Sequence, residues 1–446
     1  QNADLESVHG VHLSGVSAGS GIAQKGQSEN SALWQTDPGQ RCRRIPLREV
    51  VLLACRLEIV GAIAAIAKYS QTMKAIFLTN TDDFDAPILG GVQICSQEYF
   101  RVLKRCVNEI IRIDVHNSYH PIDRLNRKLG FKRYLNHNPG RNPLVLQQIA
   151  AHKPDLILIN HCQLLRYTKA LKLAIPNAKV VLLSHGNQSG DDLYELTSTF
   201  GRLQHQGKTS LLNTLFYGAD LIMESRYRRH FIDGVITMSE QEVAIEHWLG
   251  AKTAFYFPRI IDRDILAWNP KDNRVGFIGT LNHTPNKIAL THIFDWFQAN
   301  PQIDPPIIRL IGSGEEIGRK FQQDYSFVEY LGALNDSEAK LEIQSWQFFL
   351  NPIFWLSRGA SMKLKQALSW CIPTITTEFG SRGYSLSGPT QVSTKNSIKV
   401  FCETLFECLK SKSPASIRDA LLSHNWKEDN ESIEFKCQSF IHSLSE

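Results

Sequence analysis

Residues 358–384 read RGASMKLKQALSWCIPTITTEFGSRGY, and no other stretch of the chain says as much about its fold. Apolar residues recur along the first half of this stretch at the spacing of one helix face, which predicts an amphipathic helix over residues 360–371. These residues are Leu364, Ala367, Leu368 and Cys371. Pro373 ends the helix, and the β-branched run at residues 374–377 predicts a short buried strand.

A second buried strand is predicted just upstream, where the apolar run 348–350 leads into Asn351 and Pro352. Strand, glycine-containing loop, helix and strand in this order are typical of a parallel sheet, whose ligands bind outside the carboxyl ends of the strands. The helix N-terminus at residues 359–361 would direct free N–H groups at a bound diphosphate, and Lys363 would add positive charge. A lysine on such a helix is also an ordinary solvated residue, so this stretch alone leaves both interpretations open.

Three further strands of the second half are predicted to end in glycine turns. They are residues 274–286 (RVGFIGTLNHTPN), 307–318 (IIRLIGSGEEIG) and 327–336 (FVEYLGALND). The carboxyl ends of parallel strands lie at one edge of a sheet, so we expect the three turns to lie together there.

Taken in order, these motifs resemble the nucleotide-sugar-binding half of the retaining glycosyltransferases of group 1, the large family 4 of the GT-B type. The ordered pattern is Gly-Thr-Leu, Pro-Asn, Gly-Ser-Gly, Leu-Gly-x-Leu-x-Asp, Pro, Gly-x-x-x-Lys-x-x-x-Ala-Leu, Pro-Thr-Ile-x-Thr and Gly-x-Arg-Gly. Each motif is weak alone, but their order over about 110 residues is fairly specific. The resemblance implies an α/β GT-B fold, with two Rossmann-like domains facing across a cleft, and a hexosyltransferase or related transferase that retains the anomeric configuration.

A chain of 446 residues is long for a single core and predicts two domains with additions. We expect an N-terminal extension at 1–72, partly disordered because residues 1–45 lack a sustained apolar pattern, and an acceptor-binding domain at 73–258. A nucleotide-sugar-binding domain is expected at 259–425, followed by a helix at 426–446 that crosses back to the first domain. The apolar run 50–67 contains Arg56 and Glu58, which favours a buried or surface helix over a membrane span.

The composition restricts the class of partner. A hydrophobic content of 43% and a charged content of 21% are those of a soluble globular protein. The net charge of +5 suits an anionic substrate or membrane surface but is too small to indicate nucleic acid. The nine cysteines are scattered and form no Cys-x-x-Cys pair, which favours reduced thiols in a cytoplasm over disulfides or zinc.

In the first half, Gly90 and Gly91 follow a predicted strand at residues 73–80 and precede a helix, so the backbone there can approach a ligand closely. The strand at 179–185 ends in His185, followed by Gly186 and Asn187. A histidine at a strand end is usually a hydrogen-bonded structural residue, and a Gly-Gly pair is equally often an ordinary turn. The resemblance instead implies that these residues lie near the donor phosphates and the acceptor.

The densest basic cluster is SRYRRH at residues 225–230, with Arg226, Arg228 and Arg229. Its ordinary interpretation is a solvated helix face. The functional alternative is a contact with anionic lipid head groups at the inner face of a membrane, since many enzymes of the resembled family work there.

The resemblance implies a set of site residues. The catalytic candidates are His185, Lys363 and Arg358; the donor-binding candidates are Gly279, Thr280, Gly312, Gly314, Gly359, Ala360, Ser361, Met362, Gln366 and Arg382; the loop facing the acceptor and the phosphates contains Gly90, Gly91 and Asn187. Because helix N–H groups and basic side chains would neutralise the leaving diphosphate, neither a bound metal nor any other cofactor is expected. The expected partners are a nucleotide sugar and a sugar or lipid-linked acceptor.

The chain departs from the family at two positions. The family usually has two glutamates eight positions apart, where this sequence has Arg358 and Gln366. Gln366 still offers an amide oxygen to a ribose hydroxyl, whereas Arg358 reverses the charge. Lys287 is a candidate for a second phosphate-binding base, one helix turn from its usual place.

Two other functions remain open at this point. Without the glutamates, the chain could be a non-catalytic GT-B-like subunit that binds a sugar nucleotide or a partner enzyme. A nicotinamide-dependent oxidoreductase is suggested by the glycines 312, 314 and 318 after a strand. That spacing departs from Gly-x-Gly-x-x-Gly, and no acidic residue ends a strand about 20 residues later.

Overall fold

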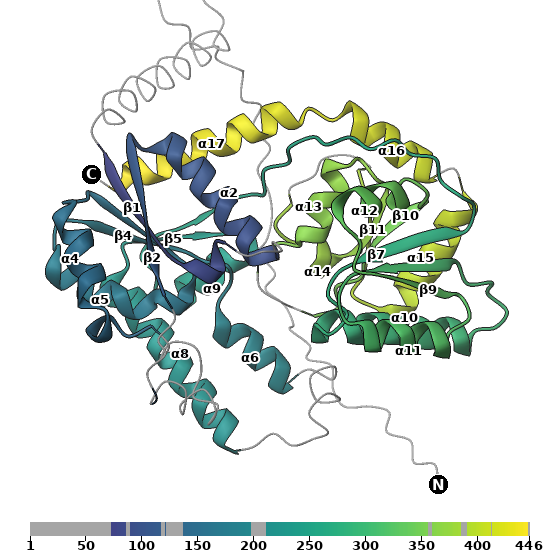
Figure 1. The fold of residues 1–446 in the computed structure, drawn as a ribbon, viewed down its shortest axis with the longest axis horizontal. Helices are drawn as coiled ribbons and strands as arrows, with labels where there is room; N and C mark the ends of the chain where they lie inside the picture. Colours follow the sequence, from purple (N-terminus) through teal and green to yellow (C-terminus); the bar gives the residue numbers. More distant parts are fainter. Residues whose placement is uncertain are drawn as a thin grey trace, which may run out of the picture. The chain divides into compact units, whose positions relative to one another are not determined.

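A computed structural model describes residues 73–85, 90–116, 121, 137–197, 211–355, 359–384, 390–411 and 413–444. The extension expected at 1–72, with its helix at 50–67, lies outside the described residues, as does Arg358. The described residues form two six-stranded sheets in which all paired strands are parallel, each covered by helices (Figure 1). The prediction of an α/β protein with two such sheets is therefore confirmed.

The first sheet has the strand order β2-β1-β3-β4-β5-β6, and we call it with its helices the first lobe. Its strands are nearly continuous apolar runs because helices cover both faces; in β1, every residue after the first is buried. The strands are β1 (Lys74–Asn80), β2 (Glu109–Val115), β3 (Leu156–Asn160), β4 (Lys179–Leu183), β5 (Gly234–Thr237) and β6 (Ala254–Tyr256). The helices are α2 (Gly91–Cys106), α4 (Pro143–Ala151), α5 (Leu165–Ala174), α6 (Gln188–Thr197), α8 (Leu211–Phe231) and α9 (Glu240–Trp248), with short 3-10 turns η1 (Thr81–Asp83), η3 (Pro139–Arg141) and η4 (Cys162–Leu164).

The second sheet, with its helices, forms the second lobe and has the order β12-β11-β10-β7-β8-β9. Its strands are β7 (Arg274–Ile278), β8 (Ile307–Ile311), β9 (Val328–Gly332), β10 (Phe348–Asn351), β11 (Thr374–Thr377) and β12 (Val392–Thr394). Its helices are α10 (Thr284–Ala299), α11 (Glu315–Asp324), α12 (Asp336–Ile343), α13 (Met362–Ser369), α14 (Glu378–Ser381), α15 (Ile398–Lys410) and α16 (Ser413–Ser423). Numbered within the lobe, this order is 3-2-1-4-5-6, the arrangement of dinucleotide-binding domains.

Each sheet has one point where the chain reverses the direction in which strands are added. In the first sheet this point lies between β1 and β3, and in the second it lies between β7 and β10. Ligands of open parallel sheets bind outside the carboxyl ends of the strands at such a point. The topology therefore directs attention to the turns that follow β7 and β10, which lead into α10 and α13.

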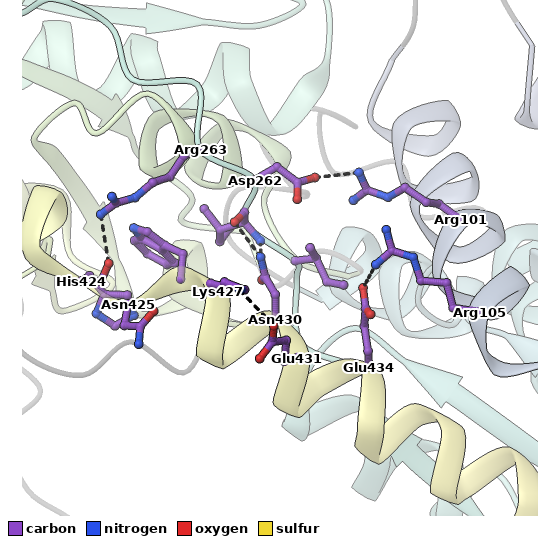
Figure 2. Close-up of a pocket in the computed structure, with 13 residues that line it drawn as sticks. Arg101, Arg105, Asp262, Arg263, His424, Asn425, Lys427, Asn430, Glu431 and Glu434 are labelled. Carbon is purple, nitrogen blue, oxygen red and sulfur yellow. Dashed lines mark hydrogen bonds and ion pairs between the residues drawn. The ribbon is translucent and has the colours of Figure 1, made fainter. Parts of the chain in front are cut away.

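Residues 257–273 connect the lobes, and α17 (Trp426–Ser443) packs against α2 of the first lobe. The Asn430 side chain of α17 clamps the backbone of Ile261 in the connection with two hydrogen bonds. Its Oδ1 accepts from the Ile261 N–H at 3.1 Å, and its Nδ2 donates to the Ile261 carbonyl at 2.9 Å. A cavity of about 470 Å³ lies beside this clamp (Figure 2). Arg101 of α2 pairs with Asp262 of the connection, and Arg105 of α2 pairs with Glu434 of α17, so these ion pairs fasten α2 both to the connection and to α17.

The prediction that Arg228 lies on an exposed basic face, open to solvent or to lipid head groups, is wrong. Arg228 is fully buried, and its guanidinium pairs with Glu246 of α9, where Nη2 lies 2.9 Å from Oε1. A side chain that neutralises an internal carboxylate is not available to lipid head groups, although Arg226 and Arg229 are exposed. Among the described residues, no helix is both long enough and apolar enough to cross a membrane.

Candidate donor site in the second lobe

The glycine turns after β7, β8 and β9 contact one another. The Gly279 N–H donates to the Ile311 carbonyl at 2.9 Å, and the Gly312 N–H donates to the Gly332 carbonyl at 2.8 Å. Gly312 has a φ of +144°, and a Cβ atom there would lie 2.0 Å from the Gly279 oxygen, so only glycine fits. The Ser313 hydroxyl lies 3.3 Å from the Thr280 hydroxyl. These contacts place Gly279, Thr280 and Gly312 together, at the edge of the sheet where the sequence predicts them.

α13 begins at Met362, two residues later than the predicted helix start, and Ser361 is its N-cap. The Ser361 hydroxyl accepts from the Leu364 N–H at 3.4 Å and donates to Asn351 Oδ1 at 2.9 Å. Asn351 is fully buried, and its amide nitrogen donates to Thr376 Oγ1 at 2.9 Å and to the Gly380 carbonyl at 3.1 Å. The helix N-terminus is therefore fixed to the ends of β10 and β11. Because α13 starts at Met362, its first N–H groups come from Met362 and Lys363.

The Lys363 side chain reaches from α13, which follows β10, to α10, which follows β7, and so spans the point where the strand order reverses. Its Nζ donates to Asn286 Oδ1 at 3.2 Å and lies 5.4 Å from the centre of the Phe277 ring, while Asn286 Nδ2 donates to the Thr280 carbonyl at 2.9 Å. No carboxylate of the described residues forms an ion pair with this ammonium group, and burial lowers its pKa to about 8. The arrangement is a partly buried cation held by a neutral amide, between the turns that follow β7 and β10. Such a site favours an incoming anion.

The sequence predicts that Arg382 neutralises a diphosphate and that Gln366 accepts from a ribose hydroxyl. Arg382 is buried, and its Nε and Nη2 donate to the Gly359 carbonyl at 3.1 and 3.0 Å. The sequence predicts a free N–H at Gly359, but this N–H donates to the Glu242 carboxylate of the first lobe at 2.8 Å. Gln366 is exposed on α13. Arg382 and the Gly359 peptide therefore shape the turn before α13.

The loop at Gly90 and Gly91 reaches the same helix N-terminus from the first lobe. A Cβ atom on Gly91 would lie 3.4 Å from Cγ of Met362, so α2 and α13 begin side by side. Gly314 adopts a φ of +103° beside Asn282 and starts α11. The predicted acceptor and phosphate loop at the start of α2 and the predicted donor-binding residues at the start of α13 are thus brought together by contacts between the lobes.

His185 and Asn160 lie at the carboxyl edge of the first sheet. His185 Nε2 lies 2.9 Å from Asn160 Oδ1, and because an amide oxygen only accepts, Nε2 carries the proton in this pair. Asn160 Nδ2 in turn donates to Thr79 Oγ1 and Ser96 Oγ, both at 2.9 Å. Asn187, by contrast, is buried within its own turn and donates to Ser189 Oγ at 3.2 Å. The structure thus places the His185 imidazole in a polar network and directs the Asn187 amide toward Ser189.

Four residues that hold the candidate site in place were missed by the sequence analysis. Asn160, Glu242 and Asn286 make the contacts described above, and Glu98 accepts from Lys365 of α13 and from Arg259. A polar signal was present for Asn160, which ends the otherwise apolar strand LILIN. Asn286 directly precedes Lys287, which the sequence analysis named as a candidate phosphate-binding base. Lys287 is exposed, whereas Asn286 contacts Lys363. Glu98 and Glu242 act through contacts distant in sequence, which no local pattern reveals. Within the described ranges, His, Cys, Asp and Glu side chains form no group of three or more that could hold a metal ion.

The comparisons with known proteins agree with this geometry at the level of the fold. No protein-family model and no curated protein sequence matches the chain. Among solved structures it is similar to Anabaena HepE in complex with UDP, at 14% identity and a TM-score of 0.54, over 82% of this chain and 100% of HepE. It is also similar to sucrose-phosphate synthase from Thermosynechococcus elongatus (15% identity, TM-score 0.56, 83% and 99% covered). The catalytic domain of starch synthase IV from Arabidopsis thaliana, bound to ADP and acarbose, gives 12% identity and a TM-score of 0.53 over 84% and 100%. The chain therefore has the GT-B fold.

Replacing Asn286 by aspartate tests whether the Lys363 ammonium is the anion-binding group. In Asn286→Asp the new carboxylate pairs with Lys363, raises its pKa and competes with a bound diphosphate. We expect the affinity for an added diphosphate, such as pyrophosphate, to fall about fivefold, the equivalent of about 1 kcal/mol for one partly exposed charge pair. Isothermal titration calorimetry measures the change. Asn282→Asp, which adds the same charge at an exposed position, is the control; equal affinity of the two variants would contradict the assignment.

Proposed function

We propose that the protein is a glycosyltransferase, which moves a sugar from a nucleoside diphosphate sugar to an acceptor hydroxyl. The observation that carries the proposal is Lys363: a partly buried ammonium group without a carboxylate partner in the described structure, fixed by Asn286 between the turns after β7 and β10. The GT-B fold supports it, since the similar HepE structure contains UDP and the similar starch synthase contains ADP.

In the proposed reaction, the bond from the anomeric carbon to the diphosphate breaks, and positive charge develops on the sugar while the diphosphate leaves with negative charge. The N–H groups that begin α13 and the Lys363 ammonium would stabilise the leaving diphosphate electrostatically. The acceptor hydroxyl would approach from the first lobe near His185, whose imidazole is oriented by Asn160. Its oxygen would form the new bond to the anomeric carbon, and its proton would pass to the leaving diphosphate oxygen. Retention of the anomeric configuration and a hexose as the transferred sugar are parts of the proposal. The coupling constant of the product's anomeric proton tests the first of these.

The proposal is tested by titrating the protein with UDP, ADP, GDP and NAD⁺, then measuring hydrolysis of the sugar nucleotide whose diphosphate binds best. Binding of one nucleoside diphosphate followed by slow donor hydrolysis is the expected result. Binding without turnover, with any acceptor offered, would favour the non-catalytic subunit. Binding of NAD⁺ alone would favour an oxidoreductase and overturn the proposal.

We expect diphosphate binding to need no metal ion, because Lys363 and the helix N–H groups supply positive potential where the phosphates would lie. The dissociation constant of UDP should change less than about twofold between a buffer with 5 mM EDTA and one with 5 mM MgCl₂, both at equal ionic strength. A loss of affinity of tenfold or more in EDTA would show that the site uses a cation to hold the diphosphate.

A further inference from the structure

The turn at Gly359 is held from both lobes at once. Its residue has a φ of +68°, and a Cβ atom there would lie 3.5 Å from the His185 oxygen and 3.7 Å from Met238 Sδ, both in the first lobe. The carbonyl of Gly359 accepts two hydrogen bonds from Arg382 of its own lobe. Its N–H donates to Glu242 Oε1 of α9 at 2.8 Å. The peptide groups on both sides of Gly359 thus have fixed orientations, one set by each lobe.

Glu242 makes a bridge between two backbone segments. Glu242 is 5% exposed, and the second oxygen of its carboxylate accepts from the Met238 N–H at 3.3 Å, just after β5. Burial raises the pKa of Glu242, while the hydrogen bond from Gly359 and the charge of Arg382 act in the opposite direction. A buried carboxylate whose two oxygens each accept a hydrogen bond from a backbone N–H group fixes the position of those groups strongly.

The turn matters because it leads directly into the start of α13. Ser361, two residues after Gly359, caps the helix, and Met362 and Lys363 supply its first N–H groups. Tyr384 reinforces this segment by donating its hydroxyl to the Ser361 carbonyl. A rotation of the Gly359 peptide would therefore change the direction of the N–H groups and of the Lys363 side chain relative to the turns at Gly279 and Gly312.

We propose that Glu242 is a positioning residue for the diphosphate: through the Gly359 N–H, the first lobe orients the phosphate-binding turn of the second. This inference rests on the proposed function, since it assumes that a nucleoside diphosphate binds at the start of α13. Glu242 would not touch the donor. Its effect would pass through one backbone hydrogen bond, so donor affinity would depend on a residue of the lobe that receives the acceptor.

The test compares Glu242→Ala with Glu242→Gln and with Glu240→Ala, an exposed carboxylate in the first turn of the same helix. We expect Glu242→Ala to weaken UDP binding about tenfold, the value of a hydrogen bond to a charged group. Glu242→Gln keeps an oxygen that accepts from Gly359 and should stay within about threefold of the wild type. Glu240→Ala should bind as the wild type does.

Hydrogen exchange of a peptide that spans residues 359–364 supplies a readout besides affinity. Exchange there should become faster in Glu242→Ala and stay close to wild type in Glu242→Gln. A Glu242→Ala protein with a lower melting temperature but unchanged UDP affinity would reduce Glu242 to a structural role and overturn the inference. If the wild type itself bound none of the nucleoside diphosphates, the proposed function would fail first, while faster exchange in Glu242→Ala would still show that the residue orients the turn.

Discussion

Replacing Glu98 by glutamine is expected to lower the free energy of unfolding by about 3–5 kcal/mol, because it leaves the buried Arg259 and the partly buried Lys365 without their shared anion. Glu98 lies on α2 and is 4% exposed. One of its oxygens accepts from Arg259 at 2.8 Å and also from the Lys365 ammonium group, and the other accepts from the Ile260 N–H at 3.0 Å. The carboxylate therefore joins the first lobe, the connection and α13.

Urea denaturation followed by circular dichroism measures this effect, and Asp262→Asn is the matched control. Asp262 also pairs with an arginine of α2, at 2.7 Å, but both side chains are about half exposed, so its loss should cost less than about 1 kcal/mol. In the double variant Glu98→Gln/Lys365→Met one of the two orphaned cations is removed, and part of the stability should return. A Glu98→Gln protein no less stable than Asp262→Asn would show that water or rearrangement compensates the two cations.

Removing the Lys363 ammonium group is expected to weaken diphosphate binding by about 1.5–3 kcal/mol, the contribution of a hydrogen bond to a charged group. Lys363→Ala should therefore raise the dissociation constant of UDP by about tenfold to a hundredfold. Lys287→Ala removes an exposed lysine from the first turn of α10 and serves as the control. Equal affinity of both variants and the wild type would remove Lys363 from the site.

The pH dependence of the same titration gives an independent check. Burial lowers the pKa of Lys363 to about 8, and a bound diphosphate favours the charged form, so binding raises that pKa. The affinity of the wild type should accordingly be highest below pH 8 and fall as the pH rises through 8. Lys363→Arg keeps its charge throughout this range, so its affinity for UDP should stay nearly level from pH 7 to pH 9.5. A decline of equal size in the arginine variant would assign the titration to another group.

The strands and turns of the second lobe could be predicted because their information is local. The apolar runs before Gly279, Gly312 and Gly332 predicted β7, β8 and β9, and Pro373 followed by Thr374 marked the start of β11. The periodicity of residues 360–371 predicted α13, although Ser361 rather than Gly359 caps it, because its hydroxyl reaches the Leu364 N–H. Parallel topology then fixed which turns lie at one edge.

The groups that hold the lobes together were beyond such reasoning. Glu98 meets Arg259 across 161 positions and Lys365 across 267, and Glu242 meets Gly359 across 117. None of these glutamates differs, in the sequence alone, from a solvated residue on an amphipathic helix. The basic cluster could not be divided into buried and exposed residues from the sequence either. Arg228 is buried while its neighbour Arg229 is exposed, because only Arg228 lies on the face of α8 that meets Glu246.

The packing of α17 bears on the order in which the protein matures on the ribosome. Apolar residues of α17, among them Ile433, Phe440 and Ile441, share one cluster with Phe77 of β1 and Tyr99 of α2. In a nascent chain, this apolar face of the first lobe thus stays uncovered until α17 is translated. By then the second lobe already has all its strands. Translation normally lets the earlier domain become native first. Here the earlier lobe cannot bury this apolar face until α17 has been made, so we expect it to become native only after translation has passed α17.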